Sequence, residues 1–481
     1  MRSRPPEPKT IAPAEFSFNA LVLGLASAEV TGGNCHDSWR SGTGKQGSET
    51  CENHCGRANE KRSVPAHAGK RIQSLPHRNQ KRRCGEVRSV VESTSHRDYG
   101  WMSMTLDTPS KAKPPILGLT QTRLVELLKE WLEPSYRAAQ ILDWVFKRRV
   151  LSFDKMSNLS RGLRAKLEEH FTLRSMTYSS VTGSHDTTRK FLFKLHDGRY
   201  VETVLIPANP SLYGEASDRL TLCVSSQVGC AYDCKFCASG LAGFTRNLTA
   251  GEIVEQIVQV EDLVKDRIDN LVFMGMGEPL ANFTNLLHAI ECLNASWGVG
   301  IGARHMTVST SGLAPNIKKL ADFPLQVRLA ISLHGASNEV REKIMPVNRK
   351  HQLEELFAAL AYWNSKRNQR LTFEFILIAG VNDSLDQARL LAKAAKPLLA
   401  KVNLIPYNTV EGLAWERPSE EQQDAFQAVL LNAGVTATLR REKGHDIAAA
   451  CGQLRLKQET EEGIIDSLIP AKRITIGAGL A

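Results

Sequence analysis

The sequence predicts an α/β protein: a partial (β/α)6 barrel preceded by a small helical domain and a β-hairpin, with a disordered N-terminal extension. From about residue 220 onward, six apolar, strand-like segments alternate with helical segments. Such alternation is typical of a parallel sheet. No dinucleotide-binding fingerprint accompanies these six units, which favours a partial barrel over an open sheet.

The composition permits a sizeable core and excludes a wholly disordered chain. Of 481 residues, 42% are hydrophobic and 23% are charged. The net charge is +10, but residues 1–101 hold 16 basic and 10 acidic side chains, so the rest of the chain is only mildly basic. This balance permits nucleic-acid binding without demonstrating it.

No membrane partner is expected, since no run of 18 apolar residues occurs. The ten cysteines do not make a disulfide scaffold, and no secretory signal is visible. We therefore expect a reducing, cytoplasmic location, and leave open whether residues 1–101 direct the chain to an organelle.

Residues 1–115 are expected to be a low-complexity, disordered extension or the result of a mis-called start. Gly, Ser, Pro, Arg and His are abundant in residues 1–101, and no helical or strand period persists there. No function is assigned to this segment.

Residues 116–173 predict a small helical accessory domain that could bind RNA. Thr120 can cap a first helix, a second helix follows Pro134, and a third contains Leu163 and Leu167. The basic residues of this domain are consistent with an ordinary solvated face or with RNA contact. They are Lys147, Arg148, Arg149, Arg161, Arg164 and Lys166.

Residues 174–215 predict a β-hairpin region, because alternating runs flank Asp197-Gly198, a strong hairpin signal. Residues 216–456 predict the barrel, followed by a C-terminal tail at 457–481. The expected strands are Leu220–Val224, Asn270–Met274, His305–Ser309, Val327–Leu333, Leu371–Ile378 and Val402–Pro406. The expected helices between them include Ala250–Lys265, Leu353–Asn364 and Ser384–Ala395.

The strongest chemical signal is Cys230-Ala-Tyr-Asp-Cys234-Lys-Phe-Cys237, in the loop after the first barrel strand. Thiolates at these spacings can surround one face of an iron–sulfur cube, each sulfur bonding one iron. Three ligands for four irons leave one iron open, as an enzyme requires for its substrate. The spacing therefore predicts a [4Fe–4S] cluster held by Cys230, Cys234 and Cys237.

Polar residues recur where the predicted barrel strands end. Ligands of parallel α/β barrels bind at the carboxyl ends of the strands, so we expect these residues to surround the barrel mouth. The polar residues are Glu278, Ser309, Ser332, His334 and Asn408, and Gly277 and Leu333 lie beside them in the same segments.

Together these motifs resemble the dual-specificity 23S rRNA/tRNA adenine-C2 methyltransferases, a family of radical S-adenosylmethionine (SAM) enzymes. The resemblance covers about residues 116–454. Besides the three cysteines, it rests on Cys223-Val-Ser-Ser-Gln-Val-Gly-Cys230, Gly275-Met-Gly-Glu-Pro-Leu280, Ser309-Thr-Ser-Gly312, Ile331-Ser-Leu-His334 and Asp446-Ile-Ala-Ala-Ala-Cys-Gly-Gln-Leu454.

The resemblance implies a radical SAM barrel in which the polar residues at the strand ends bind SAM. It also implies active thiols at Cys223 and Cys451, which by their residue type alone would be small buried hydrophobes. In the implied ping-pong mechanism Cys451 carries a methyl group as S-methylcysteine, and Glu202 removes the C2 proton. Cys223 then releases the methylated RNA by forming a disulfide with Cys451.

The implied substrates are 23S rRNA and tRNA. An external electron donor must reduce the cluster, and an external reductant must open the Cys223–Cys451 disulfide. Basic residues such as Arg246 and Lys443 could hold RNA phosphates, and the sequence does not choose among them. Two alternatives stay open: a related C8-methylating enzyme of the antibiotic-resistance type, and a non-catalytic iron–sulfur protein that binds RNA or acts as a sensor.

Overall fold

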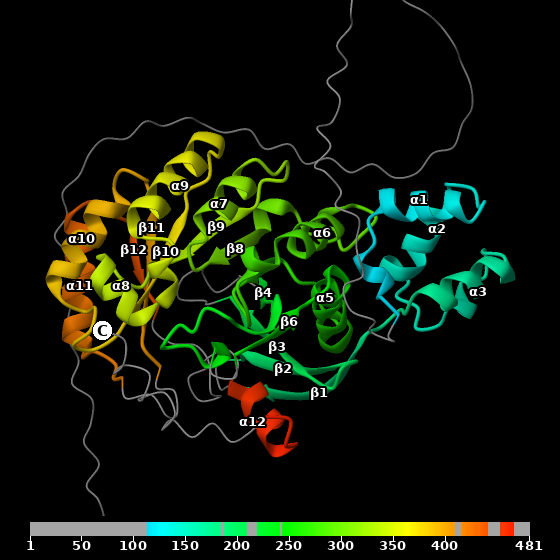
Figure 1. The fold of residues 1–481 in the computed structure, drawn as a ribbon, viewed down its shortest axis with the longest axis horizontal. Helices are drawn as coiled ribbons and strands as arrows, with labels where there is room; N and C mark the ends of the chain where they lie inside the picture. The colour runs from blue at the N-terminus through cyan, green and yellow to red at the C-terminus, as the bar shows by residue number, and fades with distance from the viewer. Residues whose placement is uncertain are drawn as a thin grey trace, which may run out of the picture. The chain divides into compact units, whose positions relative to one another are not determined.

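The computed structural model describes residues 113–183, 187–208, 219–240, 243–408, 415–440 and 453–465 (Figure 1). All of them belong to one compact unit. The expected extension therefore lies outside the described residues except for its last three positions, and Cys451 and Lys443 also lie outside them.

The helical segment begins with a short turn and contains the three expected helices. Thr120 caps α1 by accepting a hydrogen bond from the Arg123 amide, and Ser160 caps α3 in the same way through Leu163. A π-helical turn, η2, continues α2 and buries Val145 and Phe146. The elements are η1 (Ile116–Gly118), α1 (Gln121–Glu130), α2 (Arg137–Leu142), η2 (Asp143–Lys147), η3 (Phe153–Lys155) and α3 (Arg161–His170).

The expected hairpin is confirmed, and it is part of a larger sheet. Strands β2 (Arg189–Leu195) and β3 (Tyr200–Pro207) pair antiparallel around a turn in which Gly198 has a φ of 79°. A further strand, β1 (Met176–Gly183), pairs with β2. Strand β3 pairs antiparallel with the first barrel strand, so the hairpin extends the barrel sheet.

All six expected barrel strands are present, and they pair in parallel in chain order. A seventh parallel strand that was not expected, β12, follows β11 at the edge of the described sheet. The strands are β4 (Leu220–Cys223), β7 (Asn270–Phe273), β8 (Met306–Thr310), β9 (Arg328–Ser332), β10 (Thr372–Leu377), β11 (Lys401–Pro406) and β12 (Ala437–Leu439).

Helices connect these strands and bury their apolar stripes against the sheet. Figure 1 shows α6, α7 and α9 along one face of strands β8 to β10, and Phe357 of α9 meets Phe373 of β10 there. The helices are α5 (Ala250–Val264), α6 (Phe283–Asn294), α7 (Ala314–Ala321), α8 (Asn338–Ile344), α9 (Leu353–Lys366), α10 (Leu385–Ala395) and α11 (Glu420–Asn432).

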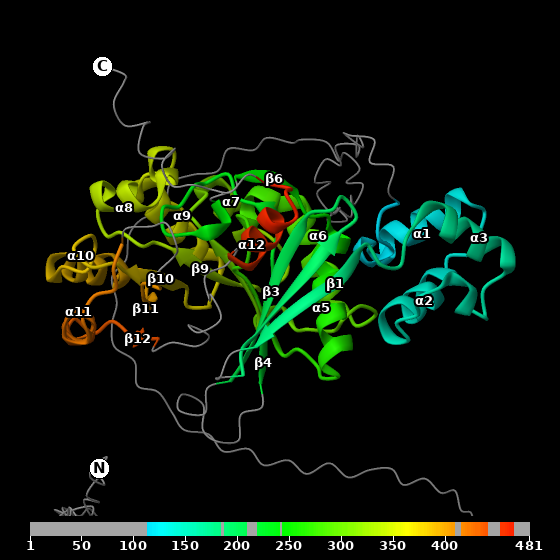
Figure 2. The same cartoon turned by 90° about the horizontal axis from the view of Figure 1, so that it is seen from below.

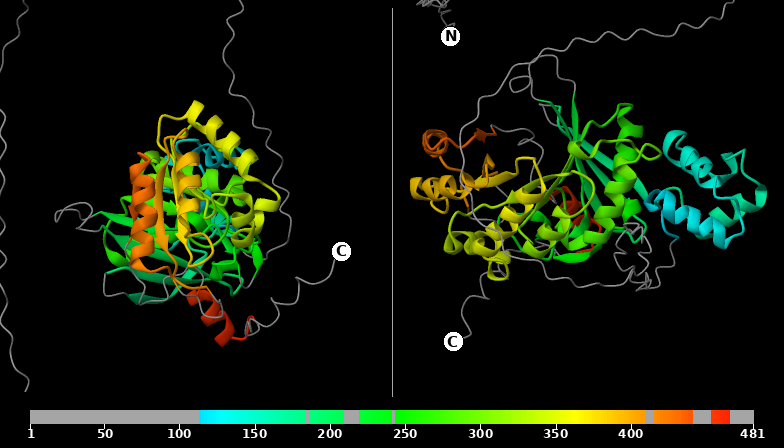
Figure 3. Two further views of the ribbon diagram at one scale, coloured as in Figure 1. Left: turned by 90° about the vertical axis from the view of Figure 1, so that its left-hand side faces the viewer. Right: turned by 90° about the horizontal axis from the view of Figure 1, so that it is seen from above.

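Within this unit the helical segment and the last barrel helices lie at opposite ends of the sheet (Figure 3). The turn η1 packs against α5, and Lys147 donates a hydrogen bond of 2.8 Å to the Gly298 carbonyl beyond α6. None of the described helices combines the length and apolarity needed to cross a membrane.

Short elements complete the described fold. Two strands, β5 (Gln227–Gly229) and β6 (Phe244–Asn247), form a separate small sheet that brackets the cysteine segment. The remaining elements are η4 (Ala238–Gly240), η5 (Pro279–Asn282), η6 (Ala303–His305), η7 (Pro346–Arg349) and α12 (Gln453–Glu461).

Candidate active site

The three motif cysteines lie in the loop between β5 and β6, and backbone contacts fix both ends of this loop. The Cys230 amide donates to the Gly243 carbonyl over 3.1 Å, which closes the base of the loop. The Lys235 amide donates to the Ile344 carbonyl over 2.9 Å, and the Phe236 ring meets the His334 ring edge-on at 4.7 Å. The loop is therefore held against the end of β9 and against α8.

Burial dominates the electrostatics of the Cys230 and Cys234 thiols. Desolvation raises the pKa of Cys230 to about 12, and it raises the pKa of Cys234 well above its ordinary value. Charge on Cys237 raises both pKa values further, which indicates that the three sulfurs are near neighbours. Such thiols become thiolates readily only when a cation compensates their charge.

Glu278 joins the ends of two neighbouring barrel strands. One carboxylate oxygen accepts a hydrogen bond of 3.0 Å from the Leu280 amide, and the other accepts one of 2.7 Å from the Ser311 amide beyond β8. Burial raises the pKa of Glu278. Gly277 just before it has a φ of 94°, a conformation that favours glycine.

His334 fixes the end of β9. Its Nδ1 atom accepts a hydrogen bond of 3.0 Å from the Ile376 amide, so the neutral ring carries its proton on Nε2. Burial, aided by the nearby Arg341 charge, lowers the pKa of His334 to about 3. The ring is therefore neutral at physiological pH.

A buried guanidinium ties these strand ends together. Arg341 donates to the Ser311 carbonyl beyond β8 over 2.5 Å and to the Leu333 carbonyl beyond β9 over 3.1 Å. Its charge also acts on Cys234 and lowers the pKa of that thiol against the effect of burial. Arg341 thus links the cysteine loop to the barrel mouth, a role that the sequence analysis did not foresee.

The structure brings the predicted polar residues to one edge of the sheet. Glu278, Ser309 and Ser332 belong to the ends of the adjacent strands β7, β8 and β9, and Asn408 follows β11. Because these strands are parallel, their carboxyl ends share that edge. Ser309, Leu333 and His334 are buried, whereas Ser332 and Asn408 are partly exposed.

Glu202 is buried in β3, and its polar neighbours among the described residues include Lys190, Arg455 and Ser225. One carboxylate oxygen lies 3.2 Å from Lys190 Nζ, and the other accepts a hydrogen bond of 2.6 Å from the Arg455 amide. The Ser225 hydroxyl donates to the Glu202 carbonyl over 2.6 Å. Glu202 is only 2% exposed, so it is not a surface carboxylate.

The sheet register places Cys223 close to Glu202. Cys223 ends β4 and pairs with Val204 of β3, so Glu202 lies two residues from its cross-strand partner and on the same face. Such diagonal neighbours lie about 7–8 Å apart between their Cα atoms. Cys223 is 6% exposed.

Cys451 lies outside the described residues, but α12 begins two residues after it, at Gln453. Figure 2 shows α12 beside β3, and the two elements are in contact. The buried side chains of α12 are Arg455 and Glu459, which form an ion pair at 2.9 Å. Glu459 also accepts a hydrogen bond of 3.1 Å from the Tyr200 amide.

Two family models match this chain. The model described as the Radical SAM superfamily matches residues 224–391, and the model of the ribosomal RNA large subunit methyltransferase N-terminal domain matches residues 115–173. A probable dual-specificity RNA methyltransferase RlmN from Akkermansia muciniphila is 54% identical over 73% of this chain and 97% of its own length. The chain belongs to the RlmN family of radical SAM RNA methyltransferases.

Other RlmN family members and a solved structure agree with this assignment. A relative from Opitutus terrae is 54% identical over 74% of this chain and 97% of its own length. The crystal structure of a radical SAM methyltransferase from Sphaerobacter thermophilus is 41% identical, covers 71% of this chain and 98% of its own, and has a TM-score of 0.66. The family resemblance and the predicted fold class are both confirmed.

RlmN family membership implies SAM and an iron–sulfur cluster, and the donor set of the cysteine loop fits a cluster. In the part of the chain that the structure describes, no three His, Cys, Asp or Glu side chains converge on the position of a single metal ion. An iron–sulfur cluster does not require ligands that converge on a single ion, because each thiolate bonds its own iron. Three cysteines along one anchored loop, of which Cys230 and Cys234 have desolvated thiols, meet that requirement.

The sequence analysis missed a buried carboxylate in this RlmN family member. In the sheet register Glu374 of β10 lies between Ser332 and Asn403, and the Asn403 amide donates to it over 2.6 Å. Its neighbour Phe375 packs on α11, so Glu374 faces the other side of the sheet, away from the helix layer. Burial raises the pKa of Glu374. A charged residue inside an apolar strand was the available signal.

Proposed function

We propose that this chain methylates C2 of adenosine in 23S rRNA and tRNA by a ping-pong mechanism in which Cys451 carries the methyl group. The observation that carries the proposal is the surroundings of Glu202. This buried carboxylate lies beside Cys223, and it is held by the first turn of the helix that follows Cys451. The RNA substrate is supported by the relatives, whose names describe dual-specificity RNA methyltransferases.

In this proposal Cys230, Cys234 and Cys237 hold a [4Fe–4S] cluster and leave one iron for SAM. When bound, the cluster supplies the electron that converts SAM into the hydrogen-abstracting species needed to activate the carried methyl group. The chain holds these cysteines close to His334 and Arg341 at the end of β9.

The residues at the strand ends would bind SAM. The Glu278 carboxylate, held by the Leu280 and Ser311 amides, would accept from the ammonium group of SAM. Gly277 lets the backbone turn tightly in front of it. The remaining contacts would come from Ser309, Ser332, Leu333, His334 and Asn408.

The chain's own side chains would carry the covalent and proton-transfer steps. The Cys451 thiol loses its proton to solvent, and its sulfur takes the methyl group of a first SAM, which leaves as S-adenosylhomocysteine. Glu202 accepts the C2 proton after the methyl carbon has bonded to the adenine, with its carboxylate oriented by Lys190 and the Arg455 amide. Cys223 then attacks the Cys451 sulfur and breaks its bond to the transferred carbon. The carbon keeps the electron pair, takes a proton and becomes the new methyl group on the released RNA, and the Cys223–Cys451 disulfide is left for an external reductant.

The deciding experiment is anaerobic reconstitution with iron and sulfide, followed by assay on 23S rRNA fragments and tRNA with labelled SAM. Mass spectrometry of the digested nucleosides should show 2-methyladenosine. Finding 8-methyladenosine would instead support the C8-methylating alternative. If dithionite yields no 5′-deoxyadenosine from the loaded protein, a non-catalytic iron–sulfur role replaces the proposal.

A thiol substitution tests the resolving step separately. Cys223→Ala should accumulate a covalent protein–RNA adduct, because the thiol that opens the Cys451–RNA linkage is missing. Denaturing gels of the reaction with labelled RNA detect this adduct. As a matched control, Cys292→Ala replaces another buried cysteine, one on the apolar side of α6, and should turn over without an adduct. Equal behaviour of the two variants would remove Cys223 from the mechanism.

A further inference from the structure

A cavity of about 510 Å³ opens between the end of the helical segment and the outer hairpin strands. Its cationic lining residues are Lys113, Arg174 and Lys194, and His196 lies at one end. Among the described residues that line this cavity, none is an aspartate or a glutamate. We propose that this cavity, which we call the hairpin groove, binds the phosphodiester backbone of the RNA substrate.

The sheet topology places the hairpin groove on the same side of the molecule as the candidate active site. The groove follows Lys194 to His196 at the end of β2, and Met176 at the start of β1 pairs with Leu195. The chain then turns directly into β3, which carries Glu202. Because β3 is antiparallel to β4, this turn lies at the edge where β4 ends and where Cys223 is found.

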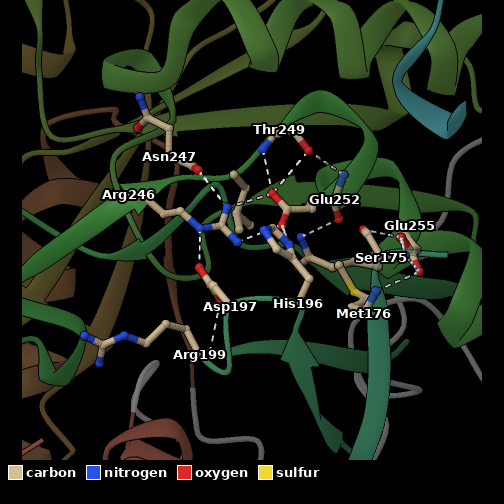
Figure 4. Close-up of polar contacts among 12 residues, drawn as sticks. Ser175, Met176, His196, Asp197, Arg199, Arg246, Asn247, Thr249, Glu252 and Glu255 are labelled. Atoms are coloured by element: carbon tan, nitrogen blue, oxygen red, sulfur yellow. Dashed lines mark hydrogen bonds and ion pairs between the residues drawn. The ribbon is translucent and has the colours of Figure 1, made fainter. Parts of the chain in front are cut away.

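Two acidic residues of α5 near the groove, Glu252 and Glu255, have polar partners within the protein (Figure 4). Glu255 of α5 accepts hydrogen bonds from the Ser175 hydroxyl at 2.6 Å and from the Ser175 amide at 2.8 Å. Glu252, one turn earlier, pairs with Arg246 of β6 at 2.8 Å and lies 3.6 Å from His196. These contacts fix the position of the wall. Two further carboxylates lie close to groove cations: Asp262 is 3.3 Å from Arg174, and Glu462 is 3.0 Å from Lys194.

Two lysines of the groove can reach an anion at little cost. Lys113 is exposed and donates only to the neutral Glu168 carbonyl, at 2.6 Å, among the contacts that the structure gives for it. Lys194 lies 3.0 Å from Glu462, but the side chains of this pair are 45% and 31% exposed, so the pair is weak. Both ammonium groups can exchange their present contacts for a phosphate oxygen.

Other basic residues that the sequence offered for RNA binding are engaged within the protein. Arg149 pairs with Glu261 and Asp262, and Arg148 pairs with Asp143 at 2.8 Å. Arg246 is held between Asp197 and Glu252. Arg149 and Arg246 pair with buried carboxylates and are largely neutralised, so they are less available to an RNA phosphate than Lys113 and Lys194.

The rest of the lining suits a nucleic-acid strand. Thr177 offers a hydroxyl group, which commonly donates to phosphate oxygens and sugars, whereas the Thr172 hydroxyl already donates to the Arg174 carbonyl and the Ser175 hydroxyl to Glu255. Met176 and Leu195 form an apolar part on which a ribose or base can rest. Cations, a hydroxyl and an apolar surface without acidic lining residues favour a phosphodiester chain over a small hydrophobic ligand.

This inference rests on the proposed function, and its test uses the reconstituted holoenzyme with a fluorescein-labelled fragment of 23S rRNA. Anisotropy titrations at several salt concentrations compare wild type with the double variant Lys113→Gln/Lys194→Gln. Each lost phosphate contact should reduce the slope of log affinity against log salt by about 0.7, so the double variant should lose about 1.4. Its affinity should fall about tenfold at low salt.

The matched control is Lys319→Gln/Lys393→Gln, which removes the same charge from exposed positions on α7 and α10. Iron content and Tm establish that each variant is folded and loaded. The groove is supported if the control keeps the wild-type slope while the groove variant loses it. Three outcomes overturn the proposal. Both variants lose the same salt slope, or the groove variant keeps the wild-type slope, or wild type does not bind the fragment.

The outcome is separable from that of the proposed function. Wild-type protein that binds the fragment but forms no 2-methyladenosine refutes the methyltransferase proposal, and the salt slopes still decide whether the groove holds the RNA. Methylation by wild type together with a wild-type slope in the groove variant refutes the groove alone.

Discussion

The parallel strands and the antiparallel extension of this sheet position their site residues by different physical means. At the parallel strands, the topology itself gathers Glu278, Ser309 and Ser332 at one edge, and backbone amides then orient the carboxylate. In the antiparallel strands, the position of the Glu202 carboxylate depends on the buried Lys190 and on the amide of Arg455, 253 residues further along the chain. The barrel site is therefore fixed by local backbone geometry, whereas the Glu202 site depends on long-range charge pairing.

The largest expected effect comes from a substitution that disrupts the barrel site and leaves the Glu202 site intact. Cys230→Ala should lose the iron–sulfur cluster and all methylation, because two thiolates cannot retain what three hold. Iron analysis and visible absorbance after anaerobic reconstitution provide the measurement. Cys292→Ala serves as the control, since that thiol is buried in the apolar packing of α6 and should leave the iron content unchanged. Full iron retention in Cys230→Ala would contradict the assignment of the ligands.

A second change disrupts the antiparallel strands β1 to β3, which carry Glu202. Lys190→Met leaves the Glu202 carboxylate buried without its ammonium partner, which should lower the free energy of unfolding by about 3–5 kcal/mol. Denaturation with urea measures this loss. The double variant Lys190→Met/Glu202→Leu should recover most of the stability, because a buried pair can often be replaced by apolar side chains.

An exposed ion pair provides the control for the Lys190 variant. Arg389→Gln removes an exposed partner of Asp386 on α10 and should change the free energy of unfolding by less than about 0.5 kcal/mol. If Lys190→Met lowers the free energy of unfolding no more than Arg389→Gln does, charge pairing does not stabilise the antiparallel strands. The contrast with the parallel strands then fails.

A third change sharpens the role of backbone geometry at the barrel mouth. A Cβ atom at Gly277 would overlap the Cβ and Cγ atoms of Gln227, and Gln227 is itself fixed by hydrogen bonds to Asn247 and to the Glu278 amide. Gly300 also has a positive φ, of 86°, but a Cβ atom there meets nothing within 4 Å. The two positions therefore separate steric overlap from backbone strain.

Gly300→Ala should cost about 1–2 kcal/mol from strain alone. Gly277→Ala should cost a further 1–3 kcal/mol, roughly, from overpacking. It should also weaken SAM binding, measured by equilibrium dialysis, because the displaced loop carries Glu278. Equal free energies of unfolding for the two variants would show that the Gly277 turn adapts without moving Gln227.

The sequence predicted the barrel well because its strands are apolar runs that the helices cover. It missed β1, in which Thr177, Ser179 and Thr182 make the strand polar and mostly exposed. It also missed Glu374, because a strand read as an apolar run leaves no place for a carboxylate.

The surroundings of Glu202 could not be predicted in the same way. The hairpin signal at Asp197-Gly198 places Glu202 on a strand, but it does not reveal that Lys190 is buried beside it. The contact with the Arg455 amide joins segments 253 residues apart, and no local pattern encodes such a contact. Arg341 is a similar case, since its partners beyond β8 and β9 are set by the packing of α8.

The smallest expected effect concerns pH at the boundary between the extension and the barrel. Contact with Glu252 raises the pKa of His196, with Arg246 opposing this effect and Asp197 supporting it. Burial disfavours the charge of Glu252, but hydrogen bonds from His196 and Arg246 lower its pKa to about 2, so it stays ionised. Protonated His196 therefore adds positive charge to the hairpin groove below its raised pKa, and this charge is lost as the pH rises through that value.

RNA affinity should accordingly increase modestly as the pH falls from about 8 to 6, over the range in which His196 gains its proton. Anisotropy titrations across this range measure the effect in wild type and in His196→Gln, which keeps a polar side chain but cannot titrate. The variant should show a flatter pH profile at nearly unchanged stability, because the imidazole is partly exposed. If the pH dependence of RNA affinity survives in His196→Gln, another group is responsible for it.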